Sequence, residues 1–531
     1  MSVAPDCLAI VIARTRHKMI QVELQEAVRR GARFIELRLD FLAKAIEVKR
    51  LAEVKQCPWI ATLRRHTDGG RWSGSESERL TVMRQMIVSG AFEWVDLETD
   101  VADQIKRFGS VKRIVSYHNL HETPTDLQAI YERMLRQDAD VLKLAVMATK
   151  PDDCRRILQL QRTAPKPTVA FCMGDLGFPT RLIGLKFGAP FIYAAFNKER
   201  GIAPGLPCLD DFRTTYPIRA IHADTAIYGL LGDPVSHSYS PILHNHLYRR
   251  LHVNALYLPF RVPAGQLSAA IQAYEQVPVQ GYSVTIPHKE AAVAAAAELD
   301  DTVRLTGAAN TLVRRPEGGF RAFNTDYLAI LDCLQAHHER VRATAGADEE
   351  VPAEANQLFA LVLGAGGVSR AVAYALARQG VHVTLTSRTY ERAAKLAAEV
   401  GCKVVDWAAR HNVQPCNLLV NGTPVGMHPN TDESPVHHSF LKPGMIVFDT
   451  VYTPENTLLI QEARARECHV ITGVELFVRQ AARQIELFTG NLPDMEPMRR
   501  LLRKAMSPVT YALEEEAAKS ESAPEPPDDT E

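Results

Sequence analysis

A lysine with unusual neighbours is the first chemical feature of the sequence. Lys143 interrupts an otherwise apolar run, while Arg38, Arg64, Arg181 and His118 stand at or just beyond the ends of other apolar runs. Desolvation and nearby like charge would lower the pKa of such a lysine, and an uncharged lysine can form an imine with a ketone. The histidine could move protons and the arginines could hold a carboxylate. The pattern therefore predicts a lysine-imine site.

A second lysine is accompanied by hydroxyl, amide and carboxylate side chains in predicted turns. Alone, Lys289 would be interpreted as surface charge, and Ser240 before Pro241 as an ordinary helix cap. The accompanying residues change that interpretation: they are Ser238, Ser240, Thr285, Asn310 and Asp326. Together they predict a site that binds a polyol and transfers a proton.

A glycine-rich turn follows the apolar run 358–363. It reads Gly364-Ala365-Gly366-Gly367 and leads into a helical stretch. Such a turn lets the backbone approach a pyrophosphate at a helix N-terminus, although Ser369 at the third small position weakens the fingerprint. The next predicted strand ends in Ser387-Arg388-Thr389 rather than in an acid, which favours NADP(H) over NAD(H).

The elements that must position the first lysine form a regular series. Eight short apolar runs alternate with amphipathic stretches in the first 220 residues: 8–13, 34–39, 59–63, 94–97, 113–117, 141–145, 168–172 and 191–195. This alternation predicts a (β/α)8 barrel, in which polar residues at the strand ends face the active site. An open doubly wound sheet is the alternative on pattern alone. For any one charged strand end a structural salt bridge is the better explanation, but charged residues at the ends of six consecutive strands are hard to explain as structure alone.

The rest of the chain predicts two further α/β domains and a tail. We expect a barrel over 1–220, a substrate-binding domain over 226–336, a Rossmann domain over 358–480 and a helical segment over 481–506 that packs back on it. The polar stretch 338–357 is expected to be an exposed insertion. Residues 507–531 are expected to be a disordered acidic tail. The tail holds eight acids against one lysine, so the remaining chain is at +6 when the whole is at −1.

Composition excludes several classes of protein. A net charge of −1 argues against a nucleic-acid binder, and no apolar run approaches the roughly 18 residues of a membrane span. The nine cysteines form no C-x-x-C pair, which argues against a disulfide framework or a zinc site and favours the cytoplasm. No metal is expected. Oligomeric state cannot be predicted, and a homodimer stays open.

The barrel half resembles type I 3-dehydroquinate dehydratase over about residues 7–215. The resemblance rests on Glu36-x-Arg38-x-Asp40, Arg64, Ser116-x-His118, Asp140-x-x-Lys143 and Arg181. It implies a Schiff base between Lys143 and the C3 ketone of 3-dehydroquinate. It also implies that His118 removes a C2 proton and helps to expel the C1 hydroxyl. Substrate-binding roles fall to Glu36, Arg38, Arg64 and Arg181.

This half departs from the family at two places. Asp68 stands where the family usually has glutamate. The closing loop, usually Ser-Ala-Pro-Gly-Gln, here reads Ile202-Ala203-Pro204-Gly205-Leu206 and lacks both polar side chains. These changes put lid closure and affinity in question, but not the imine chemistry.

Residues 227–505 resemble shikimate dehydrogenase through many ordered motifs. These include Ser238-x-Ser240-Pro241, Thr285-x-Pro287-x-Lys289, Asn324-Thr325-Asp326, Asn421-Gly422-Thr423-Pro424 and Gly473 through Gln480. The resemblance implies that Lys289 and Asp326 form the catalytic pair. It assigns the substrate carboxylate to Ser238 and Ser240, and the hydroxyls to Thr285, Asn310, Asp326 and Gln480. Cofactor contacts would come from Gly364, Ala365, Gly366, Gly367, Ser387, Arg388, Thr389, Thr423 and Gly473.

The two halves together predict a bifunctional enzyme. The barrel would dehydrate 3-dehydroquinate to 3-dehydroshikimate, and the second half would reduce that product to shikimate with NADPH. One alternative is a dehydrogenase that carries a non-catalytic or specialised barrel. An NAD-dependent quinate dehydrogenase is another, although the presence of both serines favours shikimate. A metal enzyme using the pairs His244/His246, His337/His338 or His437/His438 is the least favoured, because acidic or cysteine partners at ligand spacing are missing.

Overall fold

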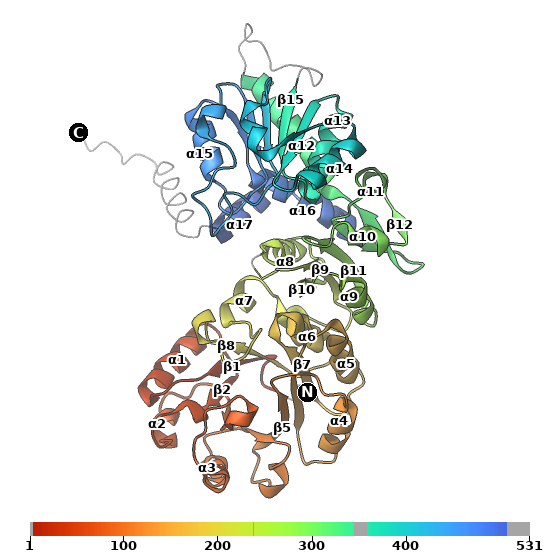
Figure 1. Ribbon diagram of the computed structural model, residues 1–531. Helices are drawn as coiled ribbons and strands as arrows, with labels where there is room; N and C mark the ends of the chain where they lie inside the picture. Colours follow the sequence, from red (N-terminus) through yellow and green to blue (C-terminus); the bar gives the residue numbers. More distant parts are fainter. Residues whose placement is uncertain (1–3, 237, 345–357, 507–531) are drawn as a thin grey trace, which may run out of the picture. The chain divides into compact units, whose positions relative to one another are not determined.

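The computed structural model describes residues 4–236, 238–344 and 358–506 (Figure 1). It divides into two compact units, Met1–Gln280 and Gly281–Glu531. All secondary structure belongs to α/β modules, as expected from the sequence. The predicted tail, 507–531, and the second part of the predicted insertion, 345–357, lie outside the described residues.

The first unit opens with a nearly closed barrel of eight parallel strands. Neighbouring strands pair in the order β7-β6-β5-β4-β3-β2-β1-β8. The eight predicted runs all form strands: β1 (Leu8–Ile12), β2 (Ile35–Arg38), β3 (Trp59–Thr62), β4 (Trp94–Glu98), β5 (Lys112–Asn119), β6 (Val141–Met147), β7 (Thr168–Met173) and β8 (Ile192–Ala195). The open doubly wound alternative is therefore wrong.

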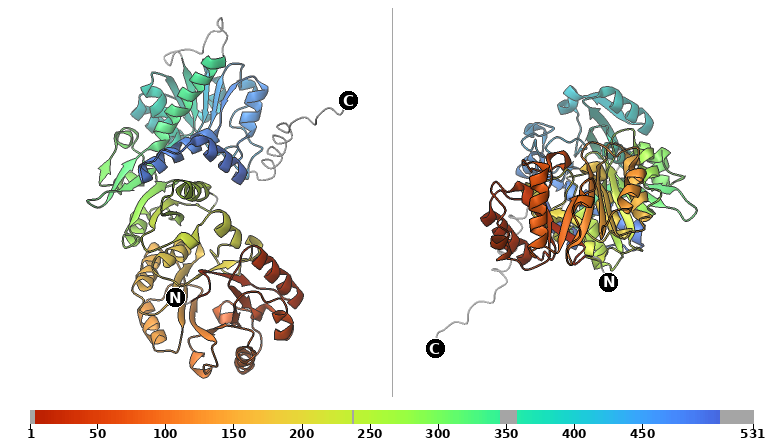
Figure 2. Two further views of the ribbon diagram at one scale, coloured as in Figure 1. Left: turned by 180° about the vertical axis from the view of Figure 1, so that it is seen from behind. Right: turned by 90° about the horizontal axis from the view of Figure 1, so that it is seen from below.

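Helices surround the barrel strands (Figure 1; Figure 2). They are α1 (His17–Arg29), α2 (Val48–Ala52), α3 (Glu76–Val88), α4 (Leu127–Leu135), α5 (Pro151–Arg162), α6 (Gly174–Lys186) and α7 (Leu209–Thr214). Local sequence sets where they begin. Ser75 and Glu78 form a capping box before α3, and Pro151 occupies the first turn of α5, where its missing N–H costs nothing.

Strand register gathers polar side chains in the barrel. Arg38, Thr62 and Asp96 are lateral neighbours across β2, β3 and β4. On β5, Ser116 is paired with Glu98 of β4 on one side and with Lys143 of β6 on the other. Aromatic rings of Phe34, Trp94 and Phe191 fill the barrel interior with edge-to-face contacts. The apolar layer therefore supports a polar cluster built from five neighbouring strands.

The first unit ends with the beginning of a second α/β module. Parallel strands β9 (Ala226–Gly232) and β10 (Ala255–Arg261) are joined by α8 (Ser240–Arg250) and followed by α9 (Leu267–Ala273). Gly229 is required for this pairing to pack, because a Cβ there would lie 2.1 Å from the Phe260 ring.

The second unit opens with short strands and a long helix. Strand β11 (Val279–Val284) begins at the unit boundary and pairs antiparallel with β13 (Thr311–Arg314), which continues to β14 (Phe320–Phe323) and β12 (Glu298–Leu299). Helices α10 (Ala291–Ala294), α11 (Asp301–Thr306) and α12 (Thr325–Thr344) accompany them. Residues 338–344 of the predicted insertion continue α12, where Gln335 and Glu339 bond one turn apart.

A parallel six-stranded sheet follows in the order β17-β16-β15-β18-β19-β20. Its strands are β15 (Phe359–Leu363), β16 (His382–Ser387), β17 (Lys403–Asp406), β18 (Leu418–Asn421), β19 (Ile446–Asp449) and β20 (His469–Ile471). The connecting helices are α13 (Gly367–Arg378), α14 (Tyr390–Val400) and α15 (Leu458–Ala465). Strand order reverses beside β15, which is where doubly wound sheets bind ligands.

Two helices complete the second unit. Helix α16 (Gly473–Thr489) is followed by α17 (Met495–Met506). Arg499 of α17 pairs with Glu475 of α16 at 2.7 Å, and Arg503 pairs with Glu455 at 2.9 Å. The expected boundary at residue 480 falls inside α16. None of the described helices combines the length and apolar character that crossing a membrane requires.

Candidate active sites

Lys143 lies inside the barrel and is 6% exposed. Its Nζ donates to Asp96 Oδ2 at 3.0 Å and lies 3.9 Å from Glu36 Oε1. The ring of Tyr193 faces the same amine, with its centroid 4.2 Å from Nζ. The closest charged partners of Lys143 are therefore carboxylates, whereas the sequence reasoning had stressed the arginines.

Arg64 is held by three acceptors on two neighbouring strands. Its Nη2 lies 2.8 Å from Asp96 Oδ2, and its Nη1 bonds Glu98 Oε1 at 2.9 Å and Ser116 Oγ at 3.0 Å. Burial opposes the charge of Arg64, but the carboxylates of Asp96 and Glu98 outweigh it and raise its pKa. Burial also disfavours the charged form of Asp96 and by itself would raise its pKa. The positive charges of Arg64 and Lys143 outweigh burial and hold that pKa well below its ordinary value.

His118 of β5 is suited to accept a proton. Burial, followed by the positive charges of Arg64 and Lys143, lowers its pKa well below the ordinary value. At neutral pH the imidazole is therefore uncharged. Its Nδ1 is buried and has no hydrogen-bond partner among the described residues, so a ring nitrogen is free for a substrate.

The other two predicted arginines have different surroundings. Arg38 forms a fork with Asp40, with bonds of 3.0 and 2.9 Å, which commits part of its guanidinium. Arg181 of α6 lies over the Phe171 ring at 4.1 Å, and in the described part of the chain its Nε is buried without a partner. Burial lowers the pKa of Arg181 to about 9. Arg181 is thus still charged at neutral pH and keeps a donor for an anion.

The loop at 202–206 contacts the barrel through apolar groups. Ile202, Ala203 and Leu206 pack against the interior cluster of the barrel. The Pro204 carbonyl accepts from the Gly174 amide at 3.1 Å and from Arg181 at 3.3 Å. A Cβ on Gly205 would lie 2.5 Å from the Gly174 carbonyl oxygen, so only glycine fits there.

Asp68, the other departure, is bound to a surface network. Its carboxylate accepts from Arg65 Nε at 2.8 Å and from Thr67 Oγ1 at 3.1 Å. Arg65 is shared with Asp100, again at 2.8 Å. These contacts engage the Asp68 side chain outside the cluster of Lys143.

The first unit also holds the two serines of the second predicted site. Ser240 is buried at the start of α8, where it is the first helical residue rather than the cap. The Ser238 hydroxyl donates to Ser240 Oγ at 3.2 Å and also accepts from the Ser240 amide. The simple capping interpretation of Ser240 is therefore wrong.

Lys289 and Asp326 form a close pair in the second unit. Lys289 Nζ lies 2.6 Å from Asp326 Oδ2, and both side chains are mostly buried. Asp326 is in the first turn of α12, and the Asn310 side chain fixes the start of that helix. Asn310 Oδ1 accepts from the Thr325 amide at 2.8 Å, and its Nδ2 donates to Thr325 Oγ1 at 2.9 Å. The pair is thus positioned by backbone as well as by charge.

Residues of α16 belong to the same region. Gln484, which the motif analysis missed, is buried and accepts from Ser283 Oγ at 2.7 Å while donating to Thr311 Oγ1 at 3.2 Å. Gln480, one turn earlier, donates to the Phe477 carbonyl at 3.0 Å. Thr285 accepts at its carbonyl from the His288 amide in the turn that leads to Lys289.

The glycine-rich turn has the geometry of a dinucleotide site. Gly364 has φ +105°, Gly366 caps α13, and a Cβ on Gly366 would meet open space. Ser369 Oγ donates to the Gly422 carbonyl, which ties the helix to the loop after β18. Arg388 is exposed just after β16. These features place backbone amides and a cation where the strand order reverses.

The other predicted cofactor residues lie in or beside the neighbouring turns. Thr423 donates to Asn421 Oδ1 through both its amide and its hydroxyl. Thr389 donates from its amide to Ser387 Oγ at 3.3 Å. Gly473 begins α16, and a Cβ there would lie 2.2 Å from the Val451 carbonyl oxygen. Ala365 packs against the apolar core of this sheet.

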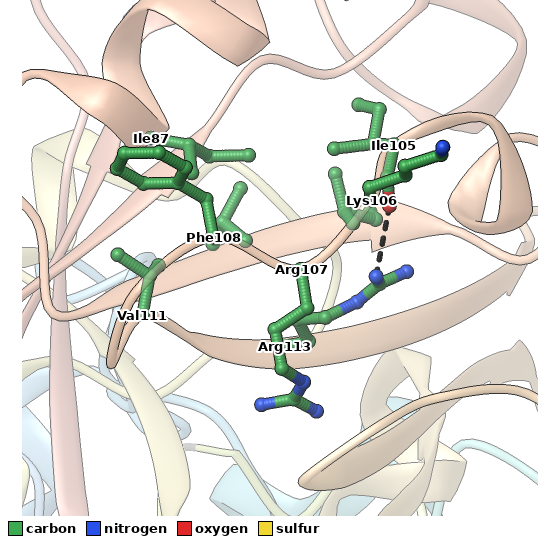
Figure 3. Close-up of a pocket in the computed structure, with 9 residues that line it drawn as sticks. Ile87, Ile105, Lys106, Arg107, Phe108, Val111 and Arg113 are labelled. Carbon is green, nitrogen blue, oxygen red and sulfur yellow. Dashed lines mark hydrogen bonds between the residues drawn. The ribbon is translucent and has the colours of Figure 1, made fainter.

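The hollow drawn in Figure 3 is separate from this chemistry. It lies between α3 and the outer face of β4 and β5, where Phe108 and Ile87 face one another and Arg113 donates to the Ile105 carbonyl at 2.8 Å. None of the predicted site residues lines it. Across the described residues, no group of three or more His, Cys, Asp and Glu side chains is arranged to hold a metal ion.

Asp96 and Tyr193 both contact Lys143 but were not among the predicted site residues. A signal for Asp96 existed, because Asp96 and Glu98 alternate within a strand that should be apolar. Tyr193 had no such signal, since an aromatic residue in a strand is ordinary. Its hydroxyl is buried without a partner among the described residues.

Family models match both halves of the chain. The type I 3-dehydroquinase model matches residues 8–223, and the shikimate dehydrogenase substrate binding domain matches 230–312. Shikimate / quinate 5-dehydrogenase matches 347–414, and the shikimate 5'-dehydrogenase C-terminal domain matches 473–503.

Curated relatives join the same two halves. The chain is 35% identical to a chloroplastic bifunctional 3-dehydroquinate dehydratase/shikimate dehydrogenase of Arabidopsis thaliana, over 91% of this chain and 81% of that protein. It is 28% identical to the shikimate biosynthesis protein AroDE of Chlamydia pneumoniae, over 86% of this chain and 89% of that protein. A shikimate dehydrogenase (NADP(+)) of Methanothermobacter thermautotrophicus is 33% identical over 54% of this chain and 99% of its own length. The chain therefore belongs to the family of bifunctional 3-dehydroquinate dehydratase/shikimate dehydrogenases.

Proposed function

We propose that the barrel dehydrates 3-dehydroquinate to 3-dehydroshikimate and that the second half reduces this ketone to shikimate. The observation that carries the first step is Lys143, a buried amine inside a barrel. The second step is supported by the Lys289–Asp326 pair at 2.6 Å.

The dehydration follows from the groups around Lys143. Lys143 releases a proton and its amine adds to the C3 ketone; the adduct takes up a proton in return and loses water, which leaves an iminium ion. This ion acidifies the C2 hydrogen, and neutral His118 takes that proton to form an enamine. The enamine expels the C1 hydroxyl, which leaves as water with a proton returned by His118. Water then hydrolyses the imine and frees Lys143.

The substrate carboxylate is the natural ligand of the arginines. Arg181 has an uncommitted Nε, while Arg64 and Arg38 are already held by Asp96, Glu98 and Asp40. We therefore assign the main carboxylate contact to Arg181. Arg64, Arg38 and Glu36 would bind the hydroxyl groups.

Borohydride trapping tests the imine directly. The full-length protein is incubated with 3-dehydroquinate and borohydride, and modified lysines are mapped by mass spectrometry. One reduced adduct at Lys143 is expected, and Lys143→Arg should lose it. His118→Asn is the matched control: it should still form the adduct, because the imine needs only the lysine, but turn over far more slowly. An adduct elsewhere, or none, would contradict the proposed mechanism.

In the second half, Lys289 is proposed to exchange a proton with the C3 oxygen while Asp326 holds its ammonium in place. Ser238 and Ser240 would bind the substrate carboxylate. Thr285, Asn310 and Gln480 would bind hydroxyls together with Asp326. The hydrogen bonds of Asn310 to Thr325 support this arrangement, because they hold the helix that carries Asp326.

Residues at the edge of the parallel six-stranded sheet are suited to bind NADP(H). The glycine turn at 364–367 would approach the pyrophosphate, and Arg388 with Ser387 and Thr389 would hold the 2′-phosphate. Thr423 follows β18 and Gly473 follows β20, at the same edge of the sheet. The bound cofactor supplies hydride. Comparison of NADPH with NADH tests the assignment, and Arg388→Ala should raise the KM for NADPH much more than that for NADH.

A specialised barrel is the second candidate, favoured by the apolar loop at 202–206 and by the engagement of Asp68 with Arg65. In that case the barrel would bind 3-dehydroquinate but turn it over slowly. Steady-state dehydration by the full chain decides between the two. For the other half, reduction of 3-dehydroshikimate compared with oxidation of quinate decides its substrate.

We further infer the domain limits 1–220, 226–336, 358–480 and 481–506. We also propose that the protein is a homodimer and that it is cytoplasmic. The nine cysteines, all in the described part of the chain, are unpaired, which suits a reducing compartment. No nucleic-acid or membrane partner is proposed. Light scattering on the purified chain tests the dimer, and cell fractionation tests the compartment.

A further inference from the structure

Arg79 is a fully buried arginine on a helix outside the barrel strands. It lies on α3 and is 0% exposed. Its Nη1 donates to the Leu63 carbonyl at 2.7 Å and to Glu98 Oε2 at 2.8 Å. Nε and Nη2 form a fork with Glu76, with bonds of 2.9 and 2.6 Å. The guanidinium is thus fixed by acceptors on three sides.

Glu98 stands between two arginines. Its Oε2 accepts from Arg79, and its Oε1 accepts from Arg64 at 2.9 Å. Arg64 continues to Asp96 at 2.8 Å, and the same Asp96 oxygen accepts from Lys143 at 3.0 Å. Charges therefore alternate without a gap from α3 to the imine-forming lysine. Removing one member of such a buried series leaves its neighbours uncompensated.

Arg79 constrains Arg64 in two independent ways. The Leu63 carbonyl belongs to the residue immediately before Arg64, so its bond to Arg79 fixes the backbone there. Glu98, also held by Arg79, fixes the guanidinium end of the same side chain. Neither Arg79 nor Glu98 contacts Lys143 in the described structure.

We propose that Arg79 and Glu98 are positioning residues for the dehydration. They hold Arg64 in the orientation that binds the substrate. This inference rests on the proposed function of the barrel. A lysine at 79 cannot replace the arginine fully, because a single ammonium lacks the planar fork that reaches Leu63, Glu98 and Glu76 together.

The test is Arg79→Lys in the full chain. A displaced Arg64 weakens substrate binding, so the KM for 3-dehydroquinate should rise about tenfold, the change that 1.4 kcal/mol of binding produces. The dehydration kcat should change by less than about threefold, since Arg64 makes no bond in the reaction. Reduction of 3-dehydroshikimate by the same chain serves as an internal control for folding and should not change.

Arg84→Lys is the matched control. Arg84 is on the same helix but is exposed, and it donates to the Gln104 carbonyl at 3.1 Å rather than to a group of the barrel cluster. Its KM should stay at the wild-type value. Glu98→Gln should raise the KM as Arg79→Lys does. The double variant should show less than the product of the two effects, because both act through Arg64.

Three outcomes would overturn the inference: equal KM values for the Arg79 and Arg84 variants, multiplicative effects in the double variant, or parallel loss of both activities of the chain. Borohydride labelling separates this failure from failure of the proposed function. If wild-type Lys143 is labelled but the KM values do not differ, only the positioning role is wrong. If wild-type Lys143 is not labelled, the proposed dehydration itself fails.

Discussion

At the scale of single residues, the behaviour of Lys289 depends on its carbon stem as well as on its charge. The ammonium is held by Asp326, but the stem lies against the glycine-rich turn. A Cβ on Gly367 would be 3.0 Å from Lys289 Cδ and 3.6 Å from its Cβ. Glycine at 367 therefore makes room for the catalytic lysine, in addition to its expected role near the cofactor.

Gly367→Ala should impair the proton transfer of the second half. The added methyl displaces the Lys289 stem by a few tenths of an ångström, and catalytic groups tolerate little misplacement. We expect the kcat for reduction of 3-dehydroshikimate to fall about tenfold, equivalent to 1.36 kcal/mol in the barrier. Dehydration by the same chain should be unchanged. Steady-state kinetics of both activities provide the measurement.

Gly366→Ala is the comparison, since a methyl there meets nothing within 4 Å. Its effect should fall on the KM for NADPH, because the backbone at 366 is expected to approach the cofactor. If both variants change only that KM, Lys289 is not displaced and the argument from its stem is wrong.

The residues of the barrel cluster could be predicted unevenly from the sequence. Lys143 and His118 stood out because charge inside an apolar strand is costly. Their pairwise geometry could not be predicted, since it depends on strand register: Ser116 is opposite Lys143 only because β5 and β6 pair as they do. For that reason the sequence could mark Asp96 as a polar residue in an apolar strand but not as the partner of Lys143.

At the scale of elements, a buried carboxylate joins two strands of the parallel six-stranded sheet to the start of helix α15. Asp449 ends β19, and its Oδ1 accepts from Asn421 Nδ2 of β18 and from the Val451 amide, both at 3.0 Å. Its Oδ2 accepts at 2.6 Å from Thr457, the residue that caps α15. Burial raises the pKa of Asp449 to about 6, against the effect of these hydrogen bonds.

The raised pKa predicts how Asp449 affects stability with pH. Between about pH 4 and 6 the unfolded chain releases this proton while the folded protein retains it, so stability falls as pH rises. Above the folded pKa the loss is complete and is on the order of 3 kcal/mol, from about two pKa units. Asp449→Asn does not titrate, so its stability relative to wild type should rise from pH 4.5 to pH 7.5. Thermal unfolding of both proteins across this range is the measurement.

Asp449→Ala separates the charge from the hydrogen bonds. It removes the charge too, but it leaves Asn421, Val451 and Thr457 without their acceptor, so it should be less stable than wild type at every pH. A constant difference between the Asn variant and wild type across the pH range would mean that Asp449 is not held with a raised pKa.

Element boundaries were predictable where local chemistry marks them. The eight barrel runs and the strand before the glycine turn were evident because parallel strands buried on both faces are continuously apolar. The end of α12 was not, since polarity at 338–344 resembles a loop although it suits an exposed helix face. Composition alone does not distinguish these two cases.

At the scale of the whole molecule, the two lysines belong to separate units. Lys143 is inside the barrel of the first unit, and Lys289 with Asp326 is in the second. Lys143 bonds Asp96 within the first unit, and Lys289 bonds Asp326 within the second. The activities should therefore be separable by mutation, while the product of one remains the substrate of the other.

Mixing two single variants tests this separation. Lys143→Met should lose dehydration and keep reduction, and Lys289→Met should do the reverse.

An equimolar mixture should convert 3-dehydroquinate to shikimate, because 3-dehydroshikimate released by one protein can diffuse to the other. Its steady rate of NADPH oxidation should approach that of wild type at an equal concentration of each active site. A lag that lengthens on dilution is expected, since the intermediate must first accumulate near the KM of the reductase. If Lys143→Met also loses reduction, the two sites are not independent. The rate of NADPH oxidation by the mixture could also stay far below the wild-type rate after the intermediate has accumulated. In that case direct transfer of the intermediate between the two sites of one chain contributes to the wild-type rate, and the two reactions are not independent.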